Sequence, residues 1–203
     1  MGVYRERVLP HLVDRVCGAP GVSTWRSRVV EGMAGEVVEI GFGSGLNVPH
    51  YPAAVTRVYA VEPALLAREL SAARVAASPV EVVHIGLDGT RLPLADDSCD
   101  AALSTFTLCT IPDVAAAVAE VRRVLRPGGT FHVLEHGLSP DPAVARAQRL
   151  LEPVQRLVAD GCHLTRQPTA LLTDAGFTLR DAHSRYGGMA TPWSWLTFAV
   201  AEA

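Results

Sequence analysis

The 203-residue chain contains no lysine, because all 18 of its basic residues are arginine. A protein without lysine has no Schiff-base lysine, no lysine general base and no P-loop lysine. Pyridoxal enzymes, lysine-dependent aldolases and P-loop nucleotide hydrolases are therefore excluded. The chain also lacks any run of basic or acidic residues, and its formal net charge is only −3. We therefore expect no nucleic-acid partner.

Cysteine is scarce and scattered, and none of the four cysteines belongs to a CxxC pair. Zinc-ribbon and thioredoxin-like sites therefore lack support, and isolated thiols favour a reducing cytoplasm. A histidine pair is no better as a metal site. On one strand, His132 and His136 would lie about 13 Å apart at a rise of about 3.3 Å per residue, too far to share an ion. We expect no metal centre.

Long apolar runs are also missing. No stretch reaches the ~18 residues that a membrane-spanning helix needs, and the N-terminus lacks the apolar core of a signal peptide. The segment Tyr4–Cys17 instead has the spacing of an amphipathic helix, with Val8, Leu12 and Val16 among its apolar positions. The sequence predicts a cytoplasmic protein without a membrane span and leaves peripheral membrane contact and the oligomeric state open.

Short apolar runs that suit strands alternate with segments of helical periodicity. In a chain of this length the alternation predicts one α/β domain with a doubly wound, mostly parallel sheet, and we expect the last two strands to pair antiparallel. The turn Arg126–Gly129 is expected to separate a helix from the strand after it. The expected strands cover residues 36–40, 57–61, 80–85, 100–105, 130–134, 177–183 and 195–201, and the expected helices cover 4–17, 23–31, 64–76, 113–125, 142–159 and 168–175.

A glycine-rich turn directly follows the first expected strand. Gly41, Gly43 and Gly45 stand where parallel sheets bind ligands, and glycine lets the backbone turn tightly beside a ligand. Leu46 occupies the place of the third glycine in the dinucleotide fingerprint GxGxxG, which disfavours an NAD dehydrogenase.

Two acidic residues follow the next two strands. Glu62 lies about twenty residues beyond the glycine turn, where a carboxylate can accept hydrogen bonds from both hydroxyls of a ribose. Asp88 follows the third strand and can accept a hydrogen bond from an adenine amino group. Glu62 could alternatively be a solvated acid at a strand end, so the nucleoside site is a hypothesis.

With the runs Leu92–Asp100 and Leu125–Gly129, these residues resemble the successive motifs of class I S-adenosylmethionine (AdoMet)-dependent methyltransferases. The resemblance covers residues of about 36 to 135. It implies a seven-stranded sheet with a reversed last strand, AdoMet as cofactor and S-adenosylhomocysteine as product. It also implies a cofactor site that runs from the methionine end through the ribose and adenine to the methyl group, formed by Glu39, Gly41, Gly43, Gly45, Asn47, Glu62, Pro63, Asp88, Gly89, Thr105 and Phe106.

Three further segments, Leu108–Ile111, Leu134–His136 and Asp160–Arg166, resemble a subgroup that includes animal membrane-associated thiol S-methyltransferases and their bacterial relatives. The animal members carry an N-terminal hydrophobic anchor, for which this chain has only the short helix Tyr4–Cys17. The resemblance implies a small acceptor with a thiol. The alternatives are an N- or C-methyltransferase acting on a phospholipid headgroup or a quinol, and a module that binds AdoMet without turnover.

A thiol acceptor reacts as its thiolate, and because a free thiol has a pKa of about 8.5, a nearby base could assist. His136, after the fifth strand, is the first candidate base and His163 the second. Asp160 could orient a histidine or bind a cationic acceptor. Hydrogen bonding within the fold is the structural alternative for His136, and helix termination is the alternative for Asp160.

Three more residues complete the expected acceptor site. Cys109 and Cys162 could contact the acceptor, although buried cysteines more often serve as small apolar fillers. Trp193 could wall an apolar pocket. We divide the domain into a helical cap (1–35), a cofactor-binding core (36–135), a helical insertion near the acceptor site (136–176) and a terminal strand pair (177–203).

Overall fold

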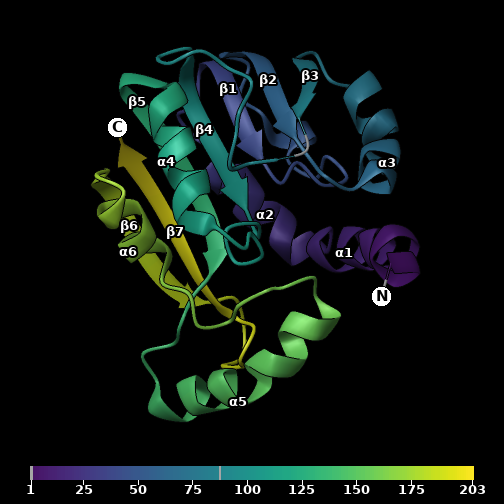
Figure 1. Cartoon of the computed structure of the whole chain (residues 1–203), viewed down its shortest axis with the longest axis vertical. Helices are drawn as coiled ribbons and strands as arrows, with labels where there is room; N and C mark the ends of the chain where they lie inside the picture. Colours follow the sequence, from purple (N-terminus) through teal and green to yellow (C-terminus); the bar gives the residue numbers. More distant parts are fainter. Residues whose placement is uncertain (1, 87) are drawn as a thin grey trace.

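The computed structural model describes residues 2–86 and 88–203, and within them the strands form one seven-stranded sheet of order β3-β2-β1-β4-β5-β7-β6 (Figure 1). Strands β1 to β5 pair in parallel, whereas β7 is antiparallel to both β5 and β6. The predicted doubly wound sheet with a reversed last strand is therefore confirmed. The strands are β1 (Gly35–Ile40), β2 (Val55–Val61), β3 (Glu81–Gly86), β4 (Cys99–Thr105), β5 (Leu125–His136), β6 (Thr178–Tyr186) and β7 (Trp195–Glu202).

The helices begin close to the predicted positions, and proline fixes several of the starts. Pro20 lies in the first turn of α2, three residues before the predicted start, because its missing N–H costs nothing there. The predicted helix 4–17 is divided into a π-helical turn and an α-helix with Pro10 in its first turn. The elements are η1 (Tyr4–Val8), α1 (Leu9–Cys17), α2 (Pro20–Val29), η2 (Val48–His50), α3 (Leu65–Ala76), α4 (Val114–Val124), α5 (Pro142–Val158) and α6 (Pro168–Asp174).

The start of β5 differs from the prediction. The expected turn Arg126–Gly129 is instead part of the strand, which begins at Leu125 directly after α4. The pairing with β4 shifts register between Cys99 and Ala101, and Gly128 has a φ of 80°, so this stretch is an irregular strand end. The predicted strand 130–134 is the regular middle of β5.

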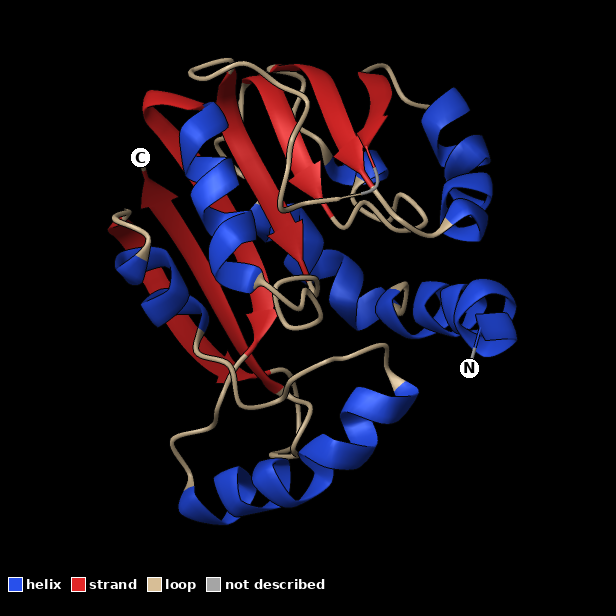
Figure 2. Ribbon diagram, in the orientation of Figure 1, coloured by secondary structure: helices blue, strands red, loops and turns tan. Residues whose placement is uncertain are grey.

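Alternating side chains of the central strands enter two hydrophobic layers. Val38 of β1 and Phe131 of β5 pack under α4 and α6, whereas Val37 and Leu134 pack on the opposite face with the end of α2. Figure 2 shows α4 in front of the sheet and α2 behind it. Because both faces are covered, the central strands are apolar on both sides.

Two helical arms lie beyond the carboxyl ends of the parallel strands. The first arm consists of η1 and α1, and the second arm is α5. In Figure 1, α1 extends across this edge of the sheet and α5 lies apart from the sheet. Asp14 of α1 accepts a hydrogen bond from Ser44 (2.6 Å) and pairs with Arg74 of α3 (2.9 Å). The Tyr4 hydroxyl donates to the carbonyl of Val158 at the end of α5 (2.9 Å). In the described parts of the chain, no helix is both long and apolar enough to cross a membrane.

Candidate active site

A cavity of about 630 Å³ opens at the carboxyl ends of β1, β2 and β4, between the sheet and the two helical arms. Its size is that of a small-molecule or cofactor site. The residues that line it include nine of the predicted site residues: Gly41, Gly43, Glu62, Pro63, Asp88, Gly89, Thr105, Phe106 and Asp160. The fold thus brings together most of the residues that the sequence assigned to the cofactor.

The glycine turn after β1 takes its shape from two positions. Gly41 has a φ of 70°, and a Cβ there would overlap the side chain of Thr107. Gly43 also has a positive φ, of 56°, but a Cβ there would meet no side chain. Only glycine adopts this backbone without strain. The turn therefore packs against the loop after β4 at Gly41 and leaves the cavity open at Gly43.

Glu62 holds this turn from the end of β2. One carboxylate oxygen accepts a hydrogen bond from the Gly43 N–H (2.7 Å), and the other accepts one from the Ala64 N–H (2.8 Å). Burial raises the pKa of Glu62, and these two bonds oppose the rise. A carboxylate accepts more than two hydrogen bonds, so Glu62 retains capacity for a ligand hydroxyl.

Asp88 forms a tight turn with Thr90, whose N–H and hydroxyl both donate to one carboxylate oxygen (2.8 and 2.7 Å). These bonds lower the pKa of Asp88, so the group is an anion at neutral pH. Asp88 lines the cavity wall, and its adenine role stays a prediction.

Glu39 and Asn47 do not line the cavity but form a buried network below it. Asn47 donates to Glu39 (2.8 Å) and accepts from Arg26 (2.7 Å), and Arg26 also donates to Thr105 (2.8 Å). Tyr51 donates to the other oxygen of Glu39. Burial raises the pKa of Glu39 to about 7 despite these bonds. Gly45 likewise lies off the cavity wall, against Ser71 and Val48.

Arg26 is a site residue that the sequence analysis missed. Its side chain lines the cavity although the residue is only 5% exposed, and it lies 5.6 Å from the centre of the Phe106 ring. In sequence, Arg26 is one arginine of a helix with no motif around it, and only its burial in the structure distinguishes it. It places a cation at the floor of the cavity.

Glu135, which lies in the motif Leu134–His136 but was not predicted as a site residue, shapes the loop after β4. Its fully buried carboxylate accepts hydrogen bonds from the Ser104 hydroxyl (2.9 Å) and from the N–H groups of Thr107 (2.7 Å) and Leu108 (2.9 Å). The loop is thereby fixed with Phe106 in the left-handed region, at a φ of 55°. Such strain persists only where the surroundings enforce it, and here it presents Phe106 to the cavity.

The two histidines predicted as bases lie off the cavity wall. His136 packs behind Phe106, with ring centres 5.2 Å apart, and burial lowers its pKa to about 4. His163 lies farther out, where its Nδ1 is 2.9 Å from a carboxylate oxygen of Glu152. Neither imidazole is placed to contact a molecule in the cavity directly.

Asp160 alone among the predicted catalytic residues lines the cavity. It pairs with Arg5 of η1, not with a histidine, and so joins the two arms across the cavity. Asp160 has a φ of 50° and precedes Gly161, which fits the end of α5. Asp160 thus follows the end of α5, as the structural alternative proposed, and also lines the cavity.

Cys109, Cys162 and Trp193 do not line the cavity. The two sulfur atoms are 3.6 Å apart in a buried contact behind it. Trp193 is about half exposed and donates to Gln155 of α5 (3.1 Å). The cavity wall on this side is formed instead by residues of α1 and α5: Leu9, Pro10, Val13, Cys17, Arg156 and Leu157.

Comparison with known proteins agrees with this geometry. Residues 38–133, which hold the glycine turn, Glu62, Asp88 and Thr105, match the family described as a methyltransferase domain. The chain contains a methyltransferase domain. The methyltransferase domain ends within β5, so the two helical arms and the terminal strand pair lie outside the matched residues.

Relatives include thiol S-methyltransferase TMT1B of Rattus norvegicus, 32% identical over 157 residues. That match covers 73% of this chain and 63% of the rat protein, so this chain spans less than two thirds of the relative. A demethylmenaquinone methyltransferase of Clavibacter sepedonicus is 33% identical over 62% of this chain and 53% of its own length.

Among solved structures, an S-adenosylmethionine-dependent methyltransferase of Thermotoga maritima superposes with a TM-score of 0.68. The two are 20% identical, and the match covers 95% of this chain and 93% of the other. This likeness shows that the chain, including the elements that flank residues 38–133, has the same fold as the Thermotoga protein.

Proposed function

We propose that the protein transfers a methyl group from AdoMet to a small-molecule acceptor, most specifically a thiol. The observation that carries the proposal is the cavity, in which a positive-φ glycine turn, Glu62 and Asp88 meet at the carboxyl edge of a methyltransferase fold. The similarity to a thiol S-methyltransferase favours the thiol.

The residues at the cavity fit AdoMet from end to end. Glu62 would accept the ribose hydroxyls, and Asp88 with Gly89 would hold the adenine. Arg26 would pair with the α-carboxylate, since it is the buried cation at the cavity floor. Thr105 and Phe106 would lie beneath the methyl group. When bound, AdoMet supplies a methyl group already activated on a sulfonium.

The remaining work of the protein is alignment and exclusion of water. Phe106, held by the Glu135 network, forms a rigid wall, and Leu9, Val13 and Leu157 make the acceptor side apolar. Among the described residues, no histidine lines the cavity. We therefore propose that a thiol enters as its thiolate and leaves its proton in solvent. Asp160 and Arg5 would hold the arms closed over the acceptor.

Methyl transfer from labelled AdoMet to three acceptors in parallel tests this function: a small alkyl thiol, a short-chain quinol and phosphatidylethanolamine. We expect label in the thiol. Label in the quinol instead would replace the thiol assignment with that of the second relative. Label in the phospholipid would assign a headgroup N-methyltransferase, and AdoMet binding without any transfer would point to a non-catalytic module.

Changing Glu62 to glutamine tests the cofactor site itself. We expect AdoMet affinity to fall by about 1–3 kcal/mol because the ribose loses its charged acceptor, which corresponds to a dissociation constant about 5 to 150 times higher. Calorimetric titration measures this, and circular dichroism checks the fold. Glu69→Gln, on α3, is the control. Unchanged affinity in a folded Glu62→Gln variant would remove the ribose role.

A further inference from the structure

The exposed apolar side chains of the protein are concentrated on the two helical arms. Of the twelve large apolar side chains that are exposed in the described residues, eight lie on the arms. Single exposed apolar residues are ordinary on a protein surface, but a cluster of them marks an interaction site. The eight are Val8, Leu12, Val13 and Val16 on the first arm, and Leu150, Val154, Leu157 and Val158 on α5.

α5 exposes apolar side chains on its outer face, which is unusual for a surface helix. Its inner face carries Gln148, which is buried and bonds to Ser139 N (2.9 Å), Gly137 O (2.9 Å) and Pro192 O (3.0 Å). The opposite face carries Leu150, which is 78% exposed, and Val154, which is 59% exposed. A surface helix normally places its apolar stripe toward the core, so the outer stripe of α5 is left for another apolar environment.

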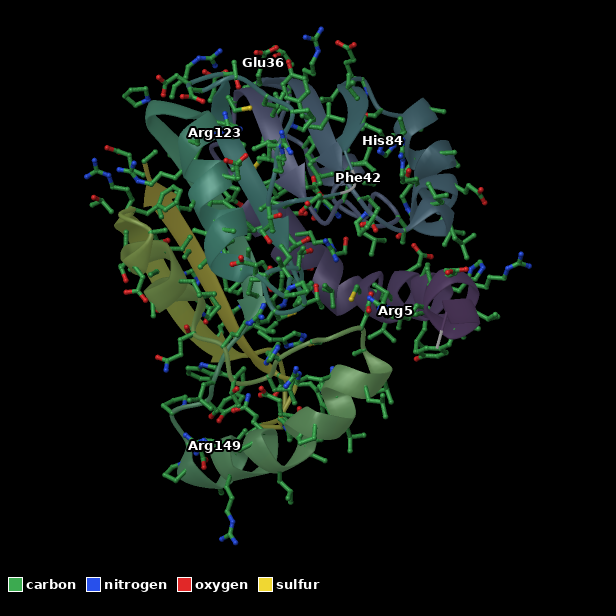
Figure 3. The ribbon with its side chains drawn as sticks, viewed as in Figure 1. Arg5, Glu36, Phe42, His84, Arg123 and Arg149 are labelled. Carbon is green, nitrogen blue, oxygen red and sulfur yellow. The ribbon has the colours of Figure 1, made fainter. Side chains whose placement is uncertain are left out.

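The same arms are basic although the protein is acidic. The spans Tyr4–Cys17 and Pro142–Val158 carry six arginines and three acidic residues, whereas the whole chain has a net charge of −3. Within the described residues, Arg146, Arg149 and Arg156 of α5 have no carboxylate partner within 4.0 Å. Figure 3 marks both arms, with Arg5 on the first and Arg149 on α5.

The two apolar stripes meet at the mouth of the cavity. Val13 of α1 and Leu157 of α5 both line the cavity and both remain about half exposed. A surface that covered the stripes would therefore also cover the opening of the cavity, and a molecule dissolved in that surface would face the opening directly.

We propose that these arms, here named the α1–α5 face, dock on an anionic phospholipid bilayer. Apolar side chains flanked by arginine are the composition of helices that lie in a membrane interface. The charge favours anionic lipid, because each arginine near such a surface adds attraction. A second copy of the chain is the poorer occupant, since two α1–α5 faces would bring like charges together. If docking is combined with the proposed function, on which this last step rests, the methyl acceptor belongs to the class of apolar molecules dissolved in the bilayer.

Flotation of the protein with vesicles tests the docking without cofactor or acceptor, so its result is independent of the proposed methyl transfer. The vesicles contain phosphatidylcholine alone or phosphatidylcholine mixed with phosphatidylglycerol. We expect flotation with the mixed vesicles only, weakened by salt because the attraction is screened. The double variant Leu150→Ser/Val154→Ser should bind at least about tenfold more weakly, since it buries less apolar area. Arg146→Gln/Arg149→Gln should weaken binding and its salt dependence.

Two matched controls keep these results specific. Met189→Ser removes an exposed apolar side chain outside the arms, and Arg28→Gln removes an exposed arginine of α2. Both should float like the wild type. The proposal is overturned if the wild type does not float with anionic vesicles, or if the face variants and controls float equally. It is also overturned if the face variants only dissociate a dimer, as measured by light scattering, because the face would then join two copies.

Discussion

The cavity has two sides: the sheet side, formed by the strand ends and their loops, and the α1–α5 side, formed by the two helical arms. Buried carboxylates fix the loops of the sheet side, whereas exposed contacts join the arms of the α1–α5 side. Glu62 and Glu135 each accept several hydrogen bonds from the loops that they fix, and both are buried. Across the cavity, Arg5 and Asp160 form a pair that is 60% and 40% exposed. Buried networks over-determine a geometry, while exposed pairs contribute little. The proposed methyl transfer needs a donor that is held in place and an acceptor that can enter, and the two sides of the cavity suit these two needs separately.

The largest effect is expected where the sheet side is most crowded. Gly41→Ala combines a positive φ with overlap between the new Cβ and the Thr107 side chain. We expect a loss of about 3 kcal/mol in the free energy of unfolding, measured with urea, and loss of AdoMet binding. Gly128→Ala is the control, because its φ is 80° but nothing lies within 4 Å of its Cβ. It should cost only about 1 kcal/mol, and equal losses would show that backbone strain alone matters.

A second prediction concerns Glu39 and pH. Its pKa of about 7 in the folded protein lies above its ordinary value of 4.5, so the native state binds the extra proton between these values. The contribution of Glu39 to stability therefore falls as pH rises from about 4.5 to 7 and stays low above pH 7. Glu39→Gln should remove on the order of 2 kcal/mol of this pH dependence, measured by urea unfolding at pH 5 and pH 8. The same slope in wild type and variant would mean that Glu39 is ionised throughout.

His136 tests whether the sheet side also supplies a base. Since it lies behind Phe106 with a pKa of about 4, it is neutral at pH 7 and does not touch the cavity. We expect His136→Gln to change transfer to a thiol by less than about tenfold, that is, less than about 1.4 kcal/mol in activation free energy. The rate should still rise with pH until the thiol itself ionises, near pH 8.5. A larger loss together with a flattened pH profile would make His136 the general base.

The smallest effect is expected on the α1–α5 side. Arg5→Gln breaks the exposed pair with Asp160 and should change the free energy of unfolding by less than about 0.5 kcal/mol. Urea unfolding measures it, with Arg7→Gln as the control for loss of charge alone. A cost of 2 kcal/mol or more would erase the contrast between the two sides, because the arms would then be as firmly held as the glycine turn.

Much of the sheet side was accessible from the sequence because its residues are local to strand ends. Gly41, Glu62 and Asp88 follow strands directly, and parallel strands bring their carboxyl ends to one edge. Arg26 and Glu135 act through partners far along the chain, Thr105 and Thr107 among them, and no spacing announces such contacts. His136 was a reasonable candidate by position, but whether it or Phe106 faces the cavity depends on the left-handed turn at Phe106.

The sequence by itself determined the order of elements, the parallel core and the glycine turn, because periodicity and strand-end residues are properties of neighbours along the chain. Only the tertiary structure decided which helix faces are covered. The periodicity of α5 is that of an ordinary core-facing helix, yet Gln148 is turned inward to meet two carbonyls and a backbone N–H, and Leu150 is left outside. Which face of a helix is buried depends on the elements that pack against it, and the sequence of the helix does not specify those elements.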